Sequence, residues 1–265
     1  MSSAVEPKAE SIARTPAIVL EHVTKQYGHG ATILDNLSAM ISPGEFVSII
    51  GPSGCGKSTL LKLVAGLSPL TSGRIAMERL TRVNARRITS FLFQDPTLLP
   101  WRTVRANVGL GLELEHSSRT ARDAAVDALL VLVGLAEVSD KYPRELSGGM
   151  KMRVSLARAL ASKPRVLLLD EPFAALDEMT RDRLNEELLR LCEQHAWTVL
   201  FVTHSVAEAV FLSNRILVLA ANPGRLMHDI AVGLPWPRTS ETRRSEEFDD
   251  LVAQISRTLR EVQGQ

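Results

Sequence analysis

The stretch Gly51–Thr59 restricts the possible folds of this chain more than any other feature. It reads GPSGCGKST, which matches the spacing G-x-x-x-x-G-K-[ST], and it directly follows the apolar run Phe46–Ile50. Glycines let a backbone wrap closely around phosphate oxygens, and the first amides of a helix offer donors and the positive end of the helix dipole. The pattern therefore predicts a buried strand, a phosphate-binding loop and a helix from about Gly56 to Gly66.

Several residues of this loop are candidates for contact with a nucleotide. We expect them to be Gly51, Ser53, Gly54, Cys55, Gly56, Lys57, Ser58 and Thr59. Lys57 would reach the β- and γ-phosphates as a point charge, and the Ser58 hydroxyl would bind Mg²⁺. A glycine-rich turn that binds nothing is the alternative, and the agreement of strand, loop and helix argues against it. Cys55 is either a reactive thiol or a small filler, and we favour the filler.

A second apolar run, Val166–Leu169, ends in two carboxylates, Asp170 and Glu171. Ligands of open α/β sheets bind at the carboxyl ends of strands. Asp170 is therefore expected to hold Mg²⁺, directly or through water, and Glu171 to polarise an attacking water as general base. A solvated strand end is the alternative, which the nearby phosphate-binding motif disfavours.

The first part of the chain is predicted to be rich in β-structure. Residues 1–16 are polar, which predicts a disordered lead-in. Apolar and β-branched residues between glycine-containing turns favour a largely antiparallel β-rich region made of residues 17–24, 31–40 and 45–50. A strand over 87–94 and a helical region over 103–135 follow, the latter with Ser118 as an N-cap and Gly134 as a stop.

Helices and strands alternate in the second part of the chain. Predicted helices cover about 149–162, 179–195 and 205–213, and predicted strands cover 165–169, 198–203 and 215–219. Such alternation predicts a parallel sheet covered by helices. Near the end, an apolar stripe from Phe248 to Leu259 predicts an amphipathic helix over about 243–262. We expect this helix to pack on the domain, and a regulatory or dimer-contact role is the alternative.

Composition excludes several classes of protein. The 31 Lys+Arg and 30 Asp+Glu residues leave a net charge of +1, and 5% of residues are aromatic, which argues against a nucleic-acid partner. Two cysteines, Cys55 and Cys192, cannot build a disulfide framework or a four-cysteine zinc site. The longest nearly apolar run, 128–136, is too short to cross a bilayer, and we see no signal peptide.

Between the two phosphate-site motifs lies Leu146-Ser147-Gly148-Gly149-Met150, followed by the helical run Lys151–Ala161. Here the sequence resembles the ATP-binding subunits of ABC transporters, whose signature is LSGGQ. Other family elements occur in the family's order over about residues 17–230. They are an adenine-stacking aromatic at Tyr27, the Q-loop residue Gln94, the D-loop Ala175–Asp177 and the switch histidine His204.

The resemblance implies a mechanism and a set of site residues. In the family the signature faces the γ-phosphate bound to the opposite subunit, so Ser147, Gly148 and Gly149 would complete the site of a second copy in a two-fold homodimer. Catalysis would involve Glu171, His204, Lys57 and Gln94, and Mg²⁺ would be held by Ser58, Gln94 and Asp170. Tyr27 as an ordinary strand aromatic and His204 as a structural histidine remain alternatives. Met150 replaces the consensus Gln, and we expect activity to survive.

The segment FQDPTLLPW at Phe93–Trp101, with LSGGM and Leu234–Arg238, resembles the nitrate, sulfonate and taurine importer group. The family docks a permease helix at this loop, so Leu98–Trp101 is predicted to be a socket for it; an apolar cluster under the helical region is the alternative. The implied partners are a second ATP-binding subunit, transmembrane permease subunits and a separate periplasmic or lipid-anchored solute-binding protein. The implied location is peripheral, at the cytoplasmic face of the inner membrane.

Together these observations predict an α/β fold with a P-loop NTPase core, a mainly parallel sheet, an antiparallel β subdomain and a helical insert. We assign residues 17–235 to an ATP-binding domain, with a helical subdomain at about 95–160, and 236–265 to a C-terminal amphipathic helical extension. The expected function is Mg-ATP hydrolysis coupled to solute import. One alternative is a soluble ABC ATPase that acts in cofactor assembly or in another non-transport role. A regulatory subunit that hydrolyses little is another, and the intact Glu171 and His204 argue against it.

Overall fold

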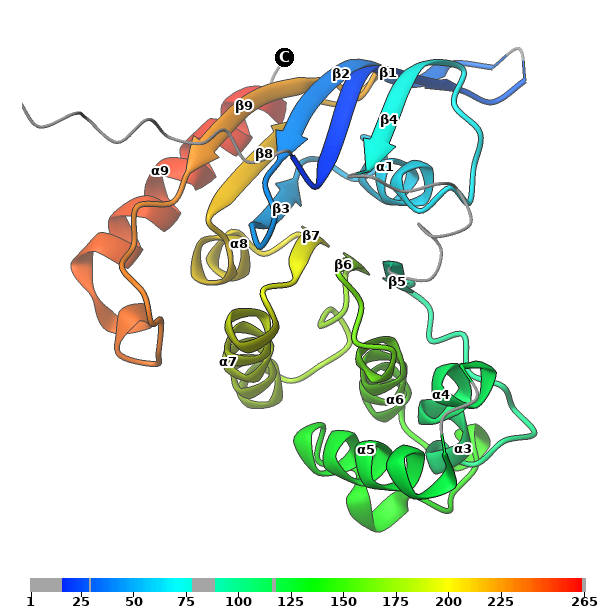
Figure 1. Ribbon diagram of the computed structural model, residues 1–265. Coiled ribbons are helices and arrows are strands. Elements are labelled where there is room, and N and C mark those ends of the chain that lie inside the picture. The colour runs from blue at the N-terminus through cyan, green and yellow to red at the C-terminus, as the bar shows by residue number, and fades with distance from the viewer. Residues whose placement is uncertain (1–15, 29, 78–88, 116–117, 264–265) are drawn as a thin grey trace, which may run out of the picture.

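The computed structural model describes residues 16–28, 30–77, 89–115 and 118–263 (Figure 1). The predicted disordered lead-in therefore lies outside the described residues, apart from Pro16. The strands are β1 Ile18–Gln26, β2 Thr32–Ile41, β3 Phe46–Ile50, β4 Ser72–Met77, β5 Thr89–Leu92, β6 Val166–Asp170, β7 Thr198–Val202, β8 Arg215–Leu219 and β9 Leu226–Ala231. The helices are α1 Lys57–Val64, α3 Val104–Val108, α4 Leu110–Leu114, α5 Arg119–Leu132, α6 Gly148–Ala161, α7 Glu178–His195, α8 Val206–Leu212 and α9 Glu246–Gln263.

The main sheet has six strands in the order β5-β6-β7-β3-β8-β9. The first five run parallel, and β9 pairs antiparallel to β8. Strand β3 lies inside the sheet, and every one of its residues is buried because both faces are covered. Residues 45–50 therefore do not belong to the antiparallel region, contrary to the sequence-based expectation. Their continuous apolar run is typical of a central parallel strand.

Alternate residues of β3 serve two separate cores. Val47 and Ile49 join the apolar cluster formed with α1 and the antiparallel strands. Phe46 and Ile50 join the cluster formed with α6, α7, α8 and α9. The main sheet thus lies between a layer that contains the small sheet and a layer of helices, which confirms the predicted fold class (Figure 1).

The small antiparallel sheet has the order β2-β1-β4 and packs with α1 over one face of the main sheet (Figure 1). Strands β1 and β2 correspond to the predicted segments 17–24 and 31–40. Strand β4 was missed because half of its residues are exposed, none is buried, and it contains Gly73 in a left-handed conformation. The edge strand β9 was missed because four of its six residues are exposed.

The region at 103–135 is helical as predicted, and its described residues form the three helices α3, α4 and α5. Thr103 caps α3 by accepting from the Ala106 amide, Gly109 separates α3 from α4, and Ser118 caps α5 as predicted. Gly134 follows α5 with φ of 66°. These helices share an apolar cluster with one face of α6, and they form the lower group in Figure 1. The strand predicted over 87–94 is shorter, with β5 beginning at residue 89; residues 87 and 88 lie outside the described part.

The C-terminal helix α9 runs along the outer edge of the molecule (Figure 1). Phe248, Ile255 and Val262 are buried in the main cluster, and Leu251 and Leu259 pack against it. The expected apolar stripe therefore faces the domain. No helix within the described ranges is both long and apolar enough to cross a membrane.

Candidate active site

Four strands of the main sheet bring the predicted site residues to one edge. The phosphate-binding loop follows β3, Gln94 follows β5, Asp170 and Glu171 end β6, and His204 follows β7. Because these strands are parallel neighbours, their carboxyl ends meet, as ligand sites in such sheets require. They frame a hollow of about 390 Å³. Its lining residues are Tyr27, Ile33, Ser53, Gly54, Gly56, Lys57, Ser58, Thr59, Gln94, Glu171 and His204.

Two glycines of the loop lie too close to neighbouring strands to carry a side chain. Gly56, the residue before α1, has a φ of 92°, and a Cβ there would lie 2.7 Å from Leu34 Cδ2. A Cβ at Gly51 would lie 2.6 Å from the Leu219 carbonyl oxygen. The loop is therefore held tightly against β2 and β8, and its amides are left to face the hollow at the start of α1.

Lys57 lies across this loop with only 5% of its surface exposed. Its Nζ donates to the carbonyl oxygens of Gly51 at 2.9 Å and Pro52 at 2.8 Å. These partners are carbonyl groups and carry no negative charge. The ammonium group therefore suits the oxygens of an incoming phosphate.

Cys55 is fully buried beneath the loop. Burial raises the pKa of its thiol, and the nearby Lys57 opposes the shift only in part. A neutral, inaccessible thiol is a poor nucleophile. The geometry supports the packing role over the reactive one.

Ser58 lines the hollow and is hydrogen-bonded to Asp170, which is buried behind it. Ser58 Oγ donates to Asp170 Oδ1 at 2.9 Å, and Asp170 is 3% exposed. Burial raises the pKa of Asp170, while the hydrogen bond from Ser58 acts in the opposite direction. The pair offers the hard oxygen ligands that Mg²⁺ prefers, and a buried carboxylate gains most from a cation beside it. These residues therefore fit Mg²⁺.

Glu171 is held between two other predicted site residues. Its Oε1 lies 2.6 Å from His204 Nε2, and its Oε2 accepts from Gln94 Nε2 at 3.4 Å. The backbone at Glu171 is left-handed, with φ of 49°, and its amide donates to the Val202 carbonyl oxygen at 3.0 Å. A non-glycine residue in this conformation is strained, and such strain is found most often at functional sites.

Tyr27 follows β1 at the mouth of the hollow and is 52% exposed. Lys25 Nζ lies 4.4 Å from the centre of its ring. The outer ring face is therefore available for a planar ligand.

The signature residues lie in a different hollow, of about 350 Å³. Ser147 caps α6 by accepting from the Met150 amide at 3.3 Å, and Gly148 and Gly149 form the first turn. The D-loop residue Asp177 lines the same hollow. The chain thus does not bring its own signature to its own phosphate-binding loop.

Sequence reasoning missed a buried polar group behind His204. Glu208 is 6% exposed, and burial raises its pKa. It accepts a hydrogen bond from Thr203 Oγ1 at 2.5 Å and faces Arg181 Nε at 3.6 Å. Arg181 in turn donates to the Leu176 carbonyl oxygen in the D-loop at 2.9 Å. The sequence feature that could have indicated this group is the acidic residue four positions after His204, in the first turn of α8.

The predicted socket Leu98–Trp101 is divided between two environments. Leu98 is half-buried and packs against the cluster of α3, α5 and α6. Trp101 is 71% exposed. Leu98 therefore fits the alternative of an apolar cluster under the helical region, whereas Trp101 is exposed enough to contact a partner helix.

A P-loop after a central parallel strand, an Asp–Glu pair at a neighbouring strand end and a separate Ser-Gly-Gly helix start define the ATP-binding cassette class of ATPase. Residues 34–174 match the ABC transporter family, and the chain belongs to that family.

The chain is also similar to particular members of this family. It is 45% identical over 227 residues to an aliphatic sulfonates import ATP-binding protein of Xanthomonas axonopodis pv. citri, which covers 84% of this chain and 90% of the relative. It is 46% identical over 230 residues to a nitrate import ATP-binding protein of Synechococcus elongatus, which covers 83% of this chain and 35% of that longer protein. These matches confirm the resemblance to the nitrate and sulfonate group.

Solved structures agree with the fold. A dimeric ATP-binding cassette in a post-hydrolysis state, bound to ADP and Pi, superposes with a TM-score of 0.76 at 32% identity. The match covers 82% of this chain and all of that one.

Proposed function

We propose that this chain is the ATP-hydrolysing subunit of an importer for a nitrate-, sulfonate- or taurine-type solute. The observation that carries the proposal is a single hollow lined by Lys57, Ser58, Glu171 and His204. In it Glu171 contacts His204, and Ser58 donates a hydrogen bond to the buried Asp170 behind it. This set serves in-line attack of water on a γ-phosphate, in which catalysis is mostly positioning and charge neutralisation. The import role is inferred from the nitrate and sulfonate import functions of the relatives.

The loop residues would bind the nucleotide. Lys57 would exchange its carbonyl partners, Gly51 and Pro52, for β- and γ-phosphate oxygens, and the amides between Gly51 and Thr59 would bind the remaining oxygens. Tyr27 would stack on the adenine. Ser58, Asp170 and Gln94 would hold Mg²⁺, which neutralises phosphate charge when bound.

Glu171 is the proposed general base. Its carboxylate would accept the proton of the attacking water, and His204 would fix the orientation of that carboxylate through the Nε2–Oε1 contact. Gln94 holds the second carboxylate oxygen, so the base is fixed on both sides. The strained backbone at Glu171 fits this demand for position.

The complete site would need a second copy of the chain. Ser147, Gly148 and Gly149 start α6, where free amides favour an anion. Because they lie apart from the phosphate-binding loop of their own chain, a two-fold dimer would let each signature reach the partner's γ-phosphate.

The remaining partners follow from the importer reading. Trp101 would anchor a cytoplasmic helix of a permease subunit, and a separate binding protein would deliver the solute. The chain would then sit peripherally at the cytoplasmic face of the inner membrane. Relatives named for import argue against the alternative role in cofactor assembly.

Two variants of the purified chain test this proposal. Lys57→Ala should lower ATP turnover by about 100-fold or more, because the phosphate charge loses its buried cation, while Lys141→Ala on the exposed surface should keep it. Glu171→Gln should retain ATP and accumulate as a dimer in gel filtration with Mg-ATP. Normal turnover by Lys57→Ala would refute the site, and a Glu171→Gln chain that stays monomeric with ATP would refute the two-chain site.

A further inference from the structure

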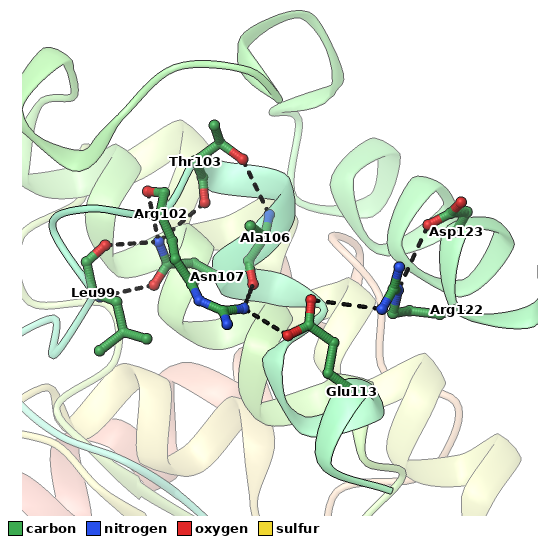
Figure 2. A network of polar contacts seen from close by, with 8 residues as sticks. All are labelled: Leu99, Arg102, Thr103, Ala106, Asn107, Glu113, Arg122 and Asp123. Carbon is green, nitrogen blue, oxygen red and sulfur yellow. Dashed lines mark hydrogen bonds and ion pairs between the residues drawn. The ribbon is translucent and has the colours of Figure 1, made fainter. Parts of the chain in front are cut away.

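The loop that carries Trp101, residues 95–103, is called the docking loop below. Its second half is hydrogen-bonded to α3 through the side chain of Asn107, which is fully buried (Figure 2). Asn107 Nδ2 lies within 3.1 Å of the carbonyl oxygens of Leu99, Arg102 and Thr103, and its Oδ1 accepts from the Leu99 amide at 2.8 Å. These bonds fix the loop backbone on both sides of Trp101.

Charged groups add a second attachment at the same end (Figure 2). Arg102 Nη1 donates to Glu113 Oε2 of α4 at 2.7 Å, and Arg122 of α5 lies 3.6 Å from the other oxygen of that carboxylate. The second half of the docking loop therefore moves with the helical group α3, α4 and α5.

The first half of the docking loop is fastened to a different helix. Arg158, on α6, donates from Nη1 to the Thr97 carbonyl oxygen at 2.7 Å and from Nη2 to Thr97 Oγ1 at 3.0 Å. Both hydrogen bonds that the structure gives this guanidinium go to Thr97. Burial lowers the pKa of Arg158, and two aligned bonds to a single residue give it a fixed direction.

Helix α6 is the element that begins with the signature. Ser147 caps its first turn, and Arg158 follows eleven residues later, which is about 16 Å along a helix that rises 1.5 Å per residue. The helix is rigidly held, because Met152 and Leu156 pack in the main cluster while Val154 and Ala157 pack in the helical cluster. A displacement of its first turn therefore reaches Arg158 without loss.

We propose that Arg158 is a positioning residue that couples the signature turn of α6 to the docking loop through Thr97. When the partner's γ-phosphate draws the signature turn inward, α6 moves as a unit and Arg158 pulls Thr97, and with it the segment that presents Trp101. This inference rests on the proposed function, because it requires that ATP closes a two-chain site.

Amide hydrogen exchange of the full chain tests the coupling. All variants carry Glu171→Gln, so that Mg-ATP accumulates the dimer. With ATP, exchange at Thr97–Thr103 should slow about fivefold, as expected for a segment whose local opening is suppressed. Adding Arg158→Gln should abolish this slowing while the phosphate-binding loop keeps its own response. Arg105→Gln is the matched control, because it breaks an arginine–aspartate pair between α3 and α5 without touching the docking loop.

Thr97→Val provides a second variant that leaves α6 intact. It removes one of the two bonds, so about half of the slowing should remain, and adding it to Arg158→Gln should change nothing further. Slowing at Thr97–Thr103 that survives Arg158→Gln would overturn the inference, since apolar packing would then suffice. The inference would also be overturned if the dimer forms with ATP but amide exchange in the docking loop does not change. An Arg158→Gln chain that no longer dimerises would overturn it as well. Absence of the dimer before Arg158 is changed would instead refute the proposed function, and the inference with it.

Discussion

Replacing Thr203 by Val removes a hydroxyl that makes two hydrogen bonds in the segment beside His204. The hydroxyl donates to Glu208 at 2.5 Å and accepts from the Ser205 amide at 3.0 Å. Valine has the same shape, so the loss is polar. A hydrogen bond to a buried charged group contributes about 1.5–3 kcal/mol. The free energy of unfolding should therefore fall by about 2 kcal/mol at neutral pH, which lowers Tm by about 4–8 °C in a chain of this size.

The pH dependence gives a second check on the same bond. Burial raises the pKa of Glu208 above its model-compound value of 4.5, so ionised Glu208 costs stability above its folded pKa, and that cost disappears as the carboxyl protonates. Thr203→Val removes a donor that favours the ionised form and raises this pKa further. The loss of stability should be largest near neutral pH and should shrink as the pH falls toward the unfolded value.

Thermal unfolding and ATP turnover measure the two effects. Thr198→Val is the matched control, because Thr198 is equally buried at the other end of β7. Its hydroxyl accepts from the Gly44 amide at 3.0 Å, and this is its one hydrogen bond to a described residue. The control should cost about 1 kcal/mol and leave turnover unchanged, whereas Thr203→Val should also lower kcat by displacing His204. Equal Tm values for the two variants at every pH, with equal kcat, would show that the Thr203–Glu208 bond supports neither the fold nor the site.

Three further outcomes are expected. Acidification should raise the Mg²⁺ concentration that half-saturates turnover, because protonated Asp170 no longer attracts the cation. This rise should begin at a higher pH than for an exposed aspartate, because burial raises the pKa of Asp170. The prediction is wrong if the half-saturating Mg²⁺ concentration of an Asp170→Asn chain depends on pH in the same way. Cys55 should react with iodoacetamide only after unfolding, as followed by mass spectrometry, since its thiol is buried and protonated. Ile255→Ala should lower the free energy of unfolding by about 3 kcal/mol in urea titration, because its side chain is fully buried between α9 and the domain; a change near zero would mean that α9 contributes nothing to the fold.

Local patterns predicted the parts of this fold in which sequence neighbours determine structure. Strand β3, the phosphate-binding loop and α1 are contiguous, and the motif states their geometry directly. The same holds for Ser118, whose capping role depends on residues three positions away. Strand pairing is not local, which is why residues 45–50 were grouped with their chain neighbours although β3 pairs with β7 and β8.

The site shows the same division. Residues at strand ends could be predicted to meet, because parallel strands expose one common edge. The contacts among Glu208, Thr203 and Arg181 could not be predicted, because no sequence motif indicates a buried ion pair between two helices. The bond from Arg158 to Thr97 spans 61 residues of sequence, and only the packing of α6 against the loop brings the two together.

The two carbonyl bonds of Lys57 bear on which nucleotides the loop accepts. Because its ammonium already has partners in Gly51 and Pro52, a ligand gains binding energy there only if its own oxygens replace both. Each charge-assisted bond contributes about 1.5–3 kcal/mol, so the exchange is favourable for a polyphosphate and unfavourable for a ligand with oxygens at one place only. We therefore expect a nucleoside monophosphate to compete poorly with a nucleoside triphosphate for this loop, even if its base stacks on Tyr27.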